Sequence, residues 1–335
     1  MDLFFARSTG WVLLIPLLAA AWGCGAAISR SDSLAHVHQG SYPYHIVTTC
    51  GMVTDIVGQV AGESATVHGL LGEGVDPHMY KPKRSDTQAL MDADVIFYSG
   101  LMLEGRMTDT FTKVSRTGKP VFAVTEEIDE SFLREPPQFA GHWDPHVWMD
   151  VSAWSECVAF VAKSLSEYDA RHADDYQQNA DRYRAELRRL DDYVRQVIAS
   201  IPEQQRVLIT AHDAFGYFSR AYGIDVRAPQ GITTESQPSM EDMNRLVDFI
   251  VERKIGAIFV ESSVNPKSSQ ALVEGARSKG HMVEISRQLL FSDAMGAPGT
   301  YEGTYIGMID HNATTIARAL GGQAPEKGLN GKLSL

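Results

Sequence analysis

A long stretch without glycine or proline, from His146 to Ile201, most constrains the fold of this chain. Within it, apolar residues recur at alternating steps of four and three, in the series Tyr176, Ala180, Tyr183, Leu187, Leu190, Val194, Val197 and Ile201. Charged residues fill the other faces, so the pattern predicts one long amphipathic helix. About 28 residues at 1.5 Å each extend roughly 40 Å, the length of a whole domain. A coiled coil would need a longer pattern, so we expect a spine that lies along two lobes.

Short β-rich runs alternate with helical patterns on both sides of this segment. The expected strands before it are 45–50, 65–71, 94–100 and 120–125. Those after it are 206–213, 224–229, 256–262 and 281–286, and a last helix covers about 304–320. This alternation is typical of βαβ units on parallel sheets. We therefore expect an α/β fold with two (βα)4-type lobes joined by the spine helix, and a ligand site in the inter-lobe cleft, outside the carboxyl ends of the strands.

The expected organisation along the chain follows from these patterns. Residues 1–24 are predicted to be a signal peptide with a lipobox, 25–43 a tether, 44–165 the N-terminal lobe, 166–201 the spine helix, 202–322 the C-terminal lobe and 323–335 a tail. A chain of 335 residues that is 44% hydrophobic can build roughly two domains. Its net charge of −12 argues against nucleic acid as a partner, because phosphates would be repelled.

The N-terminus predicts export. Arg7 precedes the apolar run Trp11–Cys24, which is too short to span a bilayer comfortably and resembles a secretory signal. Cys24 follows Ala-Trp-Gly, at the place where a lipoprotein signal carries its acylated cysteine, although Ala21 stands where an aliphatic residue is usual. We favour a periplasmic or cell-surface protein that meets the membrane only through a lipid on Cys24, over ordinary cleavage nearby.

The other two cysteines, Cys50 and Cys157, do not form a Cys-x-x-Cys pair, so a zinc knuckle is unsupported. Both are expected to be small buried hydrophobic residues. A disulfide between them is left open.

Two segments share Asp-Pro-His followed by an apolar and an aromatic residue: Gly74–Tyr80, "GVDPHMY", and His142–Trp148, "HWDPHVW". The proline ring fixes its own φ and pushes the preceding aspartate into an extended conformation, so the approach of each histidine is restricted. The alternatives are two surface turns or two preorganised imidazoles aimed at the same ligand.

Four residues fall at loop positions that could face one cleft. They are His78 after the second strand, His146 before the spine, His212 at the end of an apolar strand, and Asp293 after the last strand of the second lobe. Imidazole and carboxylate are the ligands expected for zinc, with manganese or ferrous iron possible. A catalytic zinc usually keeps one position open for water, so four protein ligands favour holding a metal over using it. The neighbouring Asp76 and Asp213 could orient ligands or cap helices.

These motifs resemble the cluster A-I (cluster 9) metal-binding lipoproteins of bacterial ABC importers, of the TroA kind. The segments that carry the resemblance are 74–80, 144–150, 207–223, 233–239, 257–263 and 291–305. The resemblance implies one metal ion held between two lobes by His78, His146, His212 and Asp293. It also implies delivery to a membrane permease driven by an ATPase subunit, and it suits a monomer.

The residue at position 212 bears on the metal. Manganese-specific relatives often have glutamate at this position, whereas zinc-type relatives and the TroA kind have histidine, so His212 favours zinc or a mixed zinc and manganese role. Zinc-specialised relatives often carry a long His-rich loop, but here the segment 134–146 is short and has only His142 as an extra histidine. Manganese and ferrous iron therefore stay open. Tight zinc binding alone would not identify the cargo, because zinc binds a given site more tightly than manganese.

The sequence thus predicts an extracytoplasmic solute-binding protein that captures a divalent transition metal, and not an enzyme. One alternative is a zinc metallohydrolase, for which Glu261 is the only candidate general base. The other is a surface adhesin that a metal ion merely stabilises.

Overall fold

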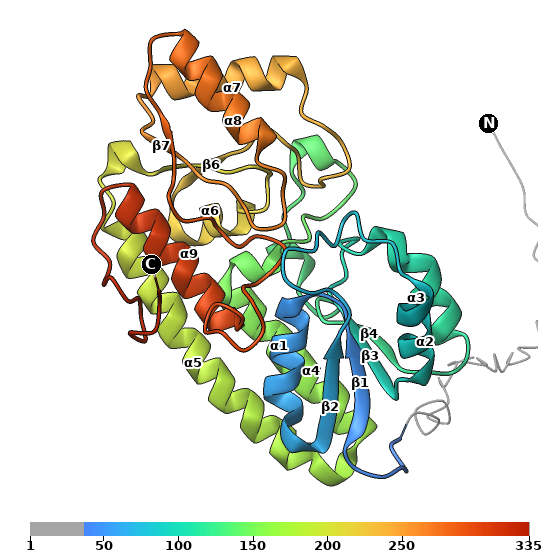
Figure 1. Cartoon of the computed structure of the whole chain (residues 1–335). Helices are drawn as coiled ribbons and strands as arrows, with labels where there is room; N and C mark the ends of the chain where they lie inside the picture. Colours follow the sequence, from blue (N-terminus) through green and yellow to red (C-terminus); the bar gives the residue numbers. More distant parts are fainter. Residues whose placement is uncertain (1–36, 335) are drawn as a thin grey trace, which may run out of the picture. The chain divides into compact units, whose positions relative to one another are not determined.

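The computed structural model describes residues 37–334 (Figure 1). The predicted signal peptide, Cys24 and the tether up to residue 36 lie outside the described residues. Within 37–334, none of the helices combines the length and the apolar character needed to cross a bilayer.

The N-terminal lobe contains a parallel four-stranded sheet with the order β2-β1-β3-β4. Its strands are β1 (Tyr44–Thr48), β2 (Ala65–Gly69), β3 (Val95–Tyr98) and β4 (Val121–Ala123). The connecting helices are α1 (Gly51–Ala61), α2 (Arg84–Asp92) and α3 (Thr108–Ser115). The four strands predicted for this lobe are confirmed; most apolar side chains of β1 and β3 are buried, whereas those of β4 are partly buried.

The C-terminal lobe has shorter strands, which form two parallel two-stranded sheets. β5 (Val207–Ile209) pairs with β6 (Asp225–Arg227), and β7 (Ala257–Ile258) pairs with β8 (Glu284–Ile285), all in parallel. The backbone N–H of Phe259 donates to the carbonyl of Ile209 at 2.8 Å, so β5 lies beside β7 and the lateral order is β6-β5-β7-β8. The helices are α6 (Gly216–Tyr222), α7 (Met240–Glu252), α8 (Lys267–Ser278) and α9 (Tyr305–Ala319).

The spine is α5 (Ala173–Ala199), preceded by α4 (Val151–Tyr168). All eight residues of the predicted apolar series are buried. α5 packs against α1 and α4 on one side and against α6 and α9 on the other, so it contacts both lobes (Figure 1). It begins later than the predicted residue 166, because Asp169 ends α4 and its carboxylate accepts the backbone N–H of Arg171 to start a short 3₁₀ turn, Ala170–His172.

The remaining 3₁₀ turns are short: Gly62–Ser64, Gly105–Met107, Glu130–Phe132, Pro137–Phe139, Val147–Met149 and Glu203–Gln205. The predicted tail packs onto the lobe, since Leu333 is buried and the backbone N–H of Leu329 donates to Asp310 at 2.9 Å. Cys50 and Cys157 are both buried and free, so no disulfide joins them.

Candidate metal centre

The four predicted ligand residues converge at the carboxyl ends of the strands. His78 lies in the loop after β2, His146 just before α4, His212 just after β5, and Asp293 in the loop after β8. One ligand atom from each lies within 4.8 Å of those of the other three. The residues are 3%, 0%, 0% and 1% exposed, respectively. Searched over 37–334, the chain holds no second group of three or more His, Cys, Asp or Glu side chains with this spacing.

The spacing of the ligand atoms fits a small cation. The Nε2 atoms of His78 and His146 are 3.3 Å apart. Asp293 Oδ1 lies 3.3 Å from His146 Nε2, and Oδ2 lies 3.2 Å from His212 Nε2 and 4.0 Å from His78 Nε2. Around a tetrahedral zinc ion with bonds of about 2.0–2.1 Å, neighbouring ligands are roughly 3.3–3.4 Å apart. Of these distances, only the one from His78 to Asp293 exceeds the tetrahedral value appreciably.

The polar atoms at the centre lack hydrogen-bond partners. Within the described part of the chain, neither carboxylate oxygen of Asp293 nor Nε2 of His212 makes a hydrogen bond, although all three atoms are buried. Buried polar atoms are nearly always paired, and an unpaired one costs about 1–3 kcal/mol. A cation that accepts lone pairs from these atoms would remove that cost, so the donor set fits a metal ion.

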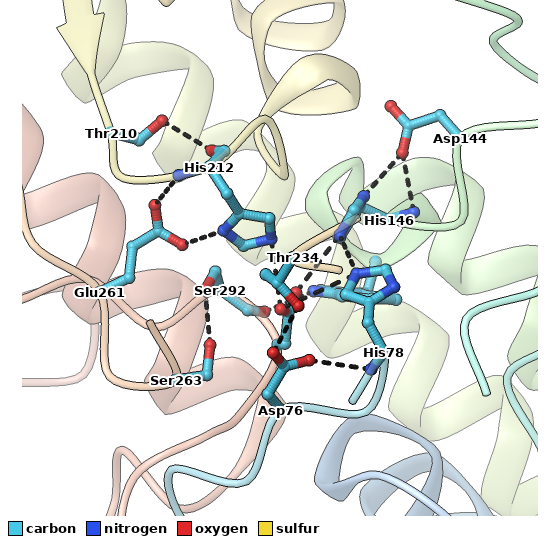
Figure 2. Close-up of polar contacts among 12 residues, drawn as sticks. Asp76, His78, Asp144, His146, Thr210, His212, Thr234, Glu261, Ser263 and Ser292 are labelled. Atoms are coloured by element: carbon cyan, nitrogen blue, oxygen red, sulfur yellow. Dashed lines mark hydrogen bonds and ion pairs between the residues drawn. The ribbon is translucent and has the colours of Figure 1, made fainter. Parts of the chain in front are cut away.

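The two Asp-Pro-His segments share one loop geometry. Oδ1 of Asp76 accepts the backbone N–H of His78 at 2.8 Å, and Oδ1 of Asp144 accepts that of His146 at 3.0 Å. Figure 2 shows the rings of His78 and His146 next to each other, with Asp144 above them and Asp76 below them. Each aspartate thus fixes the backbone that carries its histidine, which rules out the interpretation of two unrelated surface turns.

His146 is oriented by a buried carboxylate. Its Nδ1–H donates to Asp144 at 2.8 Å, which leaves Nε2 directed at the centre. Asp144 is also paired with the guanidinium of Arg134. Arg134 passes over Gly216, where a Cβ atom would lie 1.4 Å from its Nη1, so only glycine permits this approach. The sequence did not point to Arg134 or Gly216, because their contact joins residues far apart in the chain.

His212 is oriented in the same way by Glu261, which is 5% exposed. The Nδ1–H of His212 donates to Oε2 at 2.5 Å. Oε1 accepts the backbone N–H groups of Ala211 and His212 at 2.6 and 3.0 Å. Both oxygens of Glu261 are thus occupied on the side of the ring away from the centre (Figure 2). This carboxylate is an orienting group, and it is not placed to act as the general base of a hydrolase.

Replacing Glu261 with Gln is expected to weaken metal binding roughly 10–100-fold, because partners that orient ligand histidines typically contribute this much. The measurement is a competition titration with a chelator. Glu104→Gln is the matched control, since Glu104 is also buried and accepts several hydrogen bonds but touches no ligand residue. An affinity of the Glu261 variant within about threefold of the parent would contradict the orienting role.

The three imidazoles differ in pKa because their surroundings differ. Burial lowers the pKa of His78 to about 3. Burial also acts to lower the pKa of His146, but Asp144 and Asp293 outweigh it and raise this pKa to about 9. For His212, burial is outweighed by the charge of Asp293 and of the carboxylate bonded to Nδ1, so its pKa lies well above 6.5. Without metal, burial thus disfavours the charged form of His78, whereas the neighbouring carboxylates favour the protonated forms of His146 and His212.

A further contact joins the loops that carry two of the ligands. The indole N–H of Trp148 donates to the carbonyl of Ser292 at 2.9 Å in a buried hydrogen bond, and these residues are close in sequence to His146 and Asp293. Trp148 is fully buried, whereas Tyr80, the matching aromatic residue of the first segment, bonds Asp86 instead. The aromatic residue in the repeated motif was visible in the sequence, but its partner was not.

Comparison with known proteins identifies the family. Residues 46–319 match the family described as "Zinc-uptake complex component A periplasmic". The manganese-binding lipoprotein MntA of Bacillus subtilis is 45% identical over 275 residues, which cover 82% of this chain and 89% of that protein. The zinc-binding protein TroA of Treponema pallidum is 46% identical over 277 residues, covering 82% and 88%.

A solved structure agrees with these sequence matches. The structure of the periplasmic zinc-binding protein TroA from Treponema pallidum superposes with a TM-score of 0.80 at 45% identity, covering 83% of this chain and 99% of that one. The chain therefore belongs to the zinc-uptake component A family, the cluster A-I solute-binding proteins of ABC importers that its motifs resemble.

Proposed function

We propose that this chain is the extracytoplasmic solute-binding protein of an ABC importer, and that it captures one divalent transition metal ion with His78, His146, His212 and Asp293. The observation that carries the proposal is the buried cluster of these four side chains, with unpaired acceptor atoms aimed at one point. Such a centre binds a cation by exchanging it for protons, and it offers little to an anion or an organic substrate.

The cluster supports carriage of the ion over catalysis. Four protein ligands fill a tetrahedral sphere, and a hydrolytic zinc would need an open position for water. Glu261, the candidate general base, is engaged with His212 and the adjacent backbone. We therefore propose that the chain is not an enzyme and that it delivers the ion to a permease and its ATPase subunit, as a monomer.

The cargo proposed is zinc or manganese, with ferrous iron possible. Two relatives of nearly equal identity carry names for different metals, manganese in one and zinc in the other. Three imidazoles favour zinc, and the Irving–Williams order favours it further over manganese in any such site. Since relatives are named lipoproteins, we also propose export and a lipid anchor at Cys24.

Protein purified from its own host without added metal is expected to contain about one transition metal ion per chain. Saturating zinc at 1,000 times the Kd should stabilise the folded chain by about 4.1 kcal/mol, because the ion binds only the folded state. Elemental analysis gives the content, and competition titrations with zinc, manganese and iron give the affinities. A metal content clearly different from one ion per chain, or a melting temperature that metal does not change, would refute the single-site proposal.

A further inference from the structure

Residues 230–236 form the loop after β6, which we call the cross-lobe loop because its side chains contact the opposite lobe beside the metal centre. Two consecutive residues of this cross-lobe loop contact the N-terminal lobe. The hydroxyl of Thr234 donates to Oδ2 of Asp76, and Nε of Arg106 donates to Oε1 of Glu235 at 2.9 Å. Thr234 is 9% exposed, whereas the side chains of the Arg106–Glu235 pair are 29% and 50% exposed. The buried contact is therefore the better shielded of the two.

Gln230, the first residue of the cross-lobe loop, is hydrogen-bonded to the segment that carries His212. Gln230 forms a parallel β-bridge with His212, and its carbonyl accepts the backbone N–H of Asp213 at 3.1 Å. The side-chain amide of Gln230 donates to the carbonyls of Thr234 and Ser236, both at 2.9 Å. Residues 234–236 of the cross-lobe loop are thus held in a fixed position relative to His212.

Thr234 of the cross-lobe loop is hydrogen-bonded to Asp76, in the loop that carries His78. Asp76 uses Oδ1 for the backbone N–H of His78 and Oδ2 for Thr234 (Figure 2). In the second Asp-Pro-His segment, Asp144 bonds His146 and an arginine of its own lobe. His78 is therefore the histidine of the repeated motif whose aspartate is held from the opposite lobe.

We infer that Thr234 is a positioning residue that controls metal release. Its hydrogen bond to Asp76 keeps His78 in the ligand set, and loss of that bond frees the His78 loop to move away from the other three ligands. His78 lies 4.0 Å from Asp293 Oδ2, farther than His146 or His212 from the nearest carboxylate oxygen, so its approach depends on how its loop is held. Hydrogen bonds to a charged acceptor are stronger than exposed ion pairs, so Thr234 contributes more than Glu235.

The inference rests on the proposed function, and stopped-flow release of zinc and of manganese into a chromogenic chelator tests it. Thr234→Val keeps the shape and removes the hydroxyl, and it should speed release about tenfold while the association rate changes less than about twofold. Thr234→Ser should restore the parent rate. On an Asp76→Ala background, Thr234→Val should add nothing, because its partner is already gone.

Glu235→Gln is the matched control, since it breaks the neighbouring contact of the same loop without touching Asp76. Its release rate should stay within about twofold of the parent. The inference is overturned if Thr234→Val releases metal at the parent rate, if Thr234→Ser fails to restore the rate, or if Glu235→Gln is equally fast. A parent protein that binds no metal would instead refute the proposed function, so the two failures are distinguishable.

Discussion

Replacing Asp293 with Asn is expected to abolish tight metal binding while the metal-free chain stays folded. The carboxylate lies within 3.2–4.0 Å of Nε2 of all three histidines, and both of its oxygens are otherwise unpaired. The amide keeps the shape but removes the negative charge. The loss should exceed the roughly 10–100-fold expected for a residue that only orients a ligand. Chelator competition measures the affinity, and circular dichroism with thermal melting checks the fold.

Asp213→Asn is the matched control, because it removes one carboxylate charge next to a ligand residue. Asp213 accepts a hydrogen bond from Gln138 at 2.9 Å and does not belong to the ligand cluster. Its affinity should remain within about tenfold of the parent, below the effect expected at Asp293. An Asp293 variant that binds as tightly as this control would remove Asp293 from the ligand set. A metal-free Asp293 variant that unfolds would favour a structural role for the residue.

Metal affinity is expected to rise with pH, and the contribution of His146 to this rise should level off near pH 9. The pKa of His146 is about 9 in the metal-free protein, and that of His212 is also raised. The ion must displace these protons, so below the raised pKa each retained proton lowers the apparent affinity about tenfold per pH unit. Above about pH 9, His146 has no proton left to displace. Calorimetry in two buffers of different ionisation enthalpy should detect about one to two protons released per ion at pH 7.

The same raised pKa has a defined effect on the stability of the metal-free chain. His146 titrates at 6.5 when unperturbed and at about 9 in the folded chain, so its contribution to the free energy of unfolding is complete below pH 6.5 and is lost as pH rises through 9.

For the calorimetry of metal binding, His281→Gln is a suitable control, since His281 bonds the carbonyl of Ile255 outside the cluster. Zinc binding that releases no protons at pH 7 would contradict the protonated state of the centre.

Much of the fold was predictable because its signals are local. The 4-3 spacing of apolar residues predicted α5, and all eight of those residues are buried. The β-rich runs between helical patterns predicted the strands of both lobes. The start of α5 was placed too early because an aspartate does not by itself predict the end of a helix. Asp169 ends α4 through hydrogen bonds that it accepts from Tyr42, which is remote in sequence, and from Tyr176, which lies on the next helix.

The four residues of the centre were predictable because each lies beside the end of a regular element. The carboxyl ends of parallel strands meet at one edge, so side chains in the following loops can meet although they are far apart in sequence. The sequence and the resemblance together named all four, and the structure brings them within 4.8 Å. Their coordination of a metal ion remains a prediction that the Asp293 experiment tests.

The residues that orient the ligands were less accessible from the sequence. Glu261 was named, but for the role of general base, because a carboxylate after a strand does not reveal which way it points. The contacts of Arg134 with Asp144 and of Trp148 with Ser292 depend on how segments from different elements pack. No local pattern encodes such partners.

The sequence by itself determined the alternation of strands and helices, the long spine and the four candidate ligands, because periodicity and loop position are properties of the chain alone. Only the tertiary structure decided what the repeated Asp-Pro-His segments do differently. Both aspartates hold the backbone of their histidine. Asp144 also bonds the ring of His146, whereas Asp76 reaches Thr234 in the opposite lobe. The reason is physical: the second oxygen of each carboxylate bonds the donor that packing brings beside it, which is Arg134 of the same lobe for Asp144 and Thr234 of the opposite lobe for Asp76.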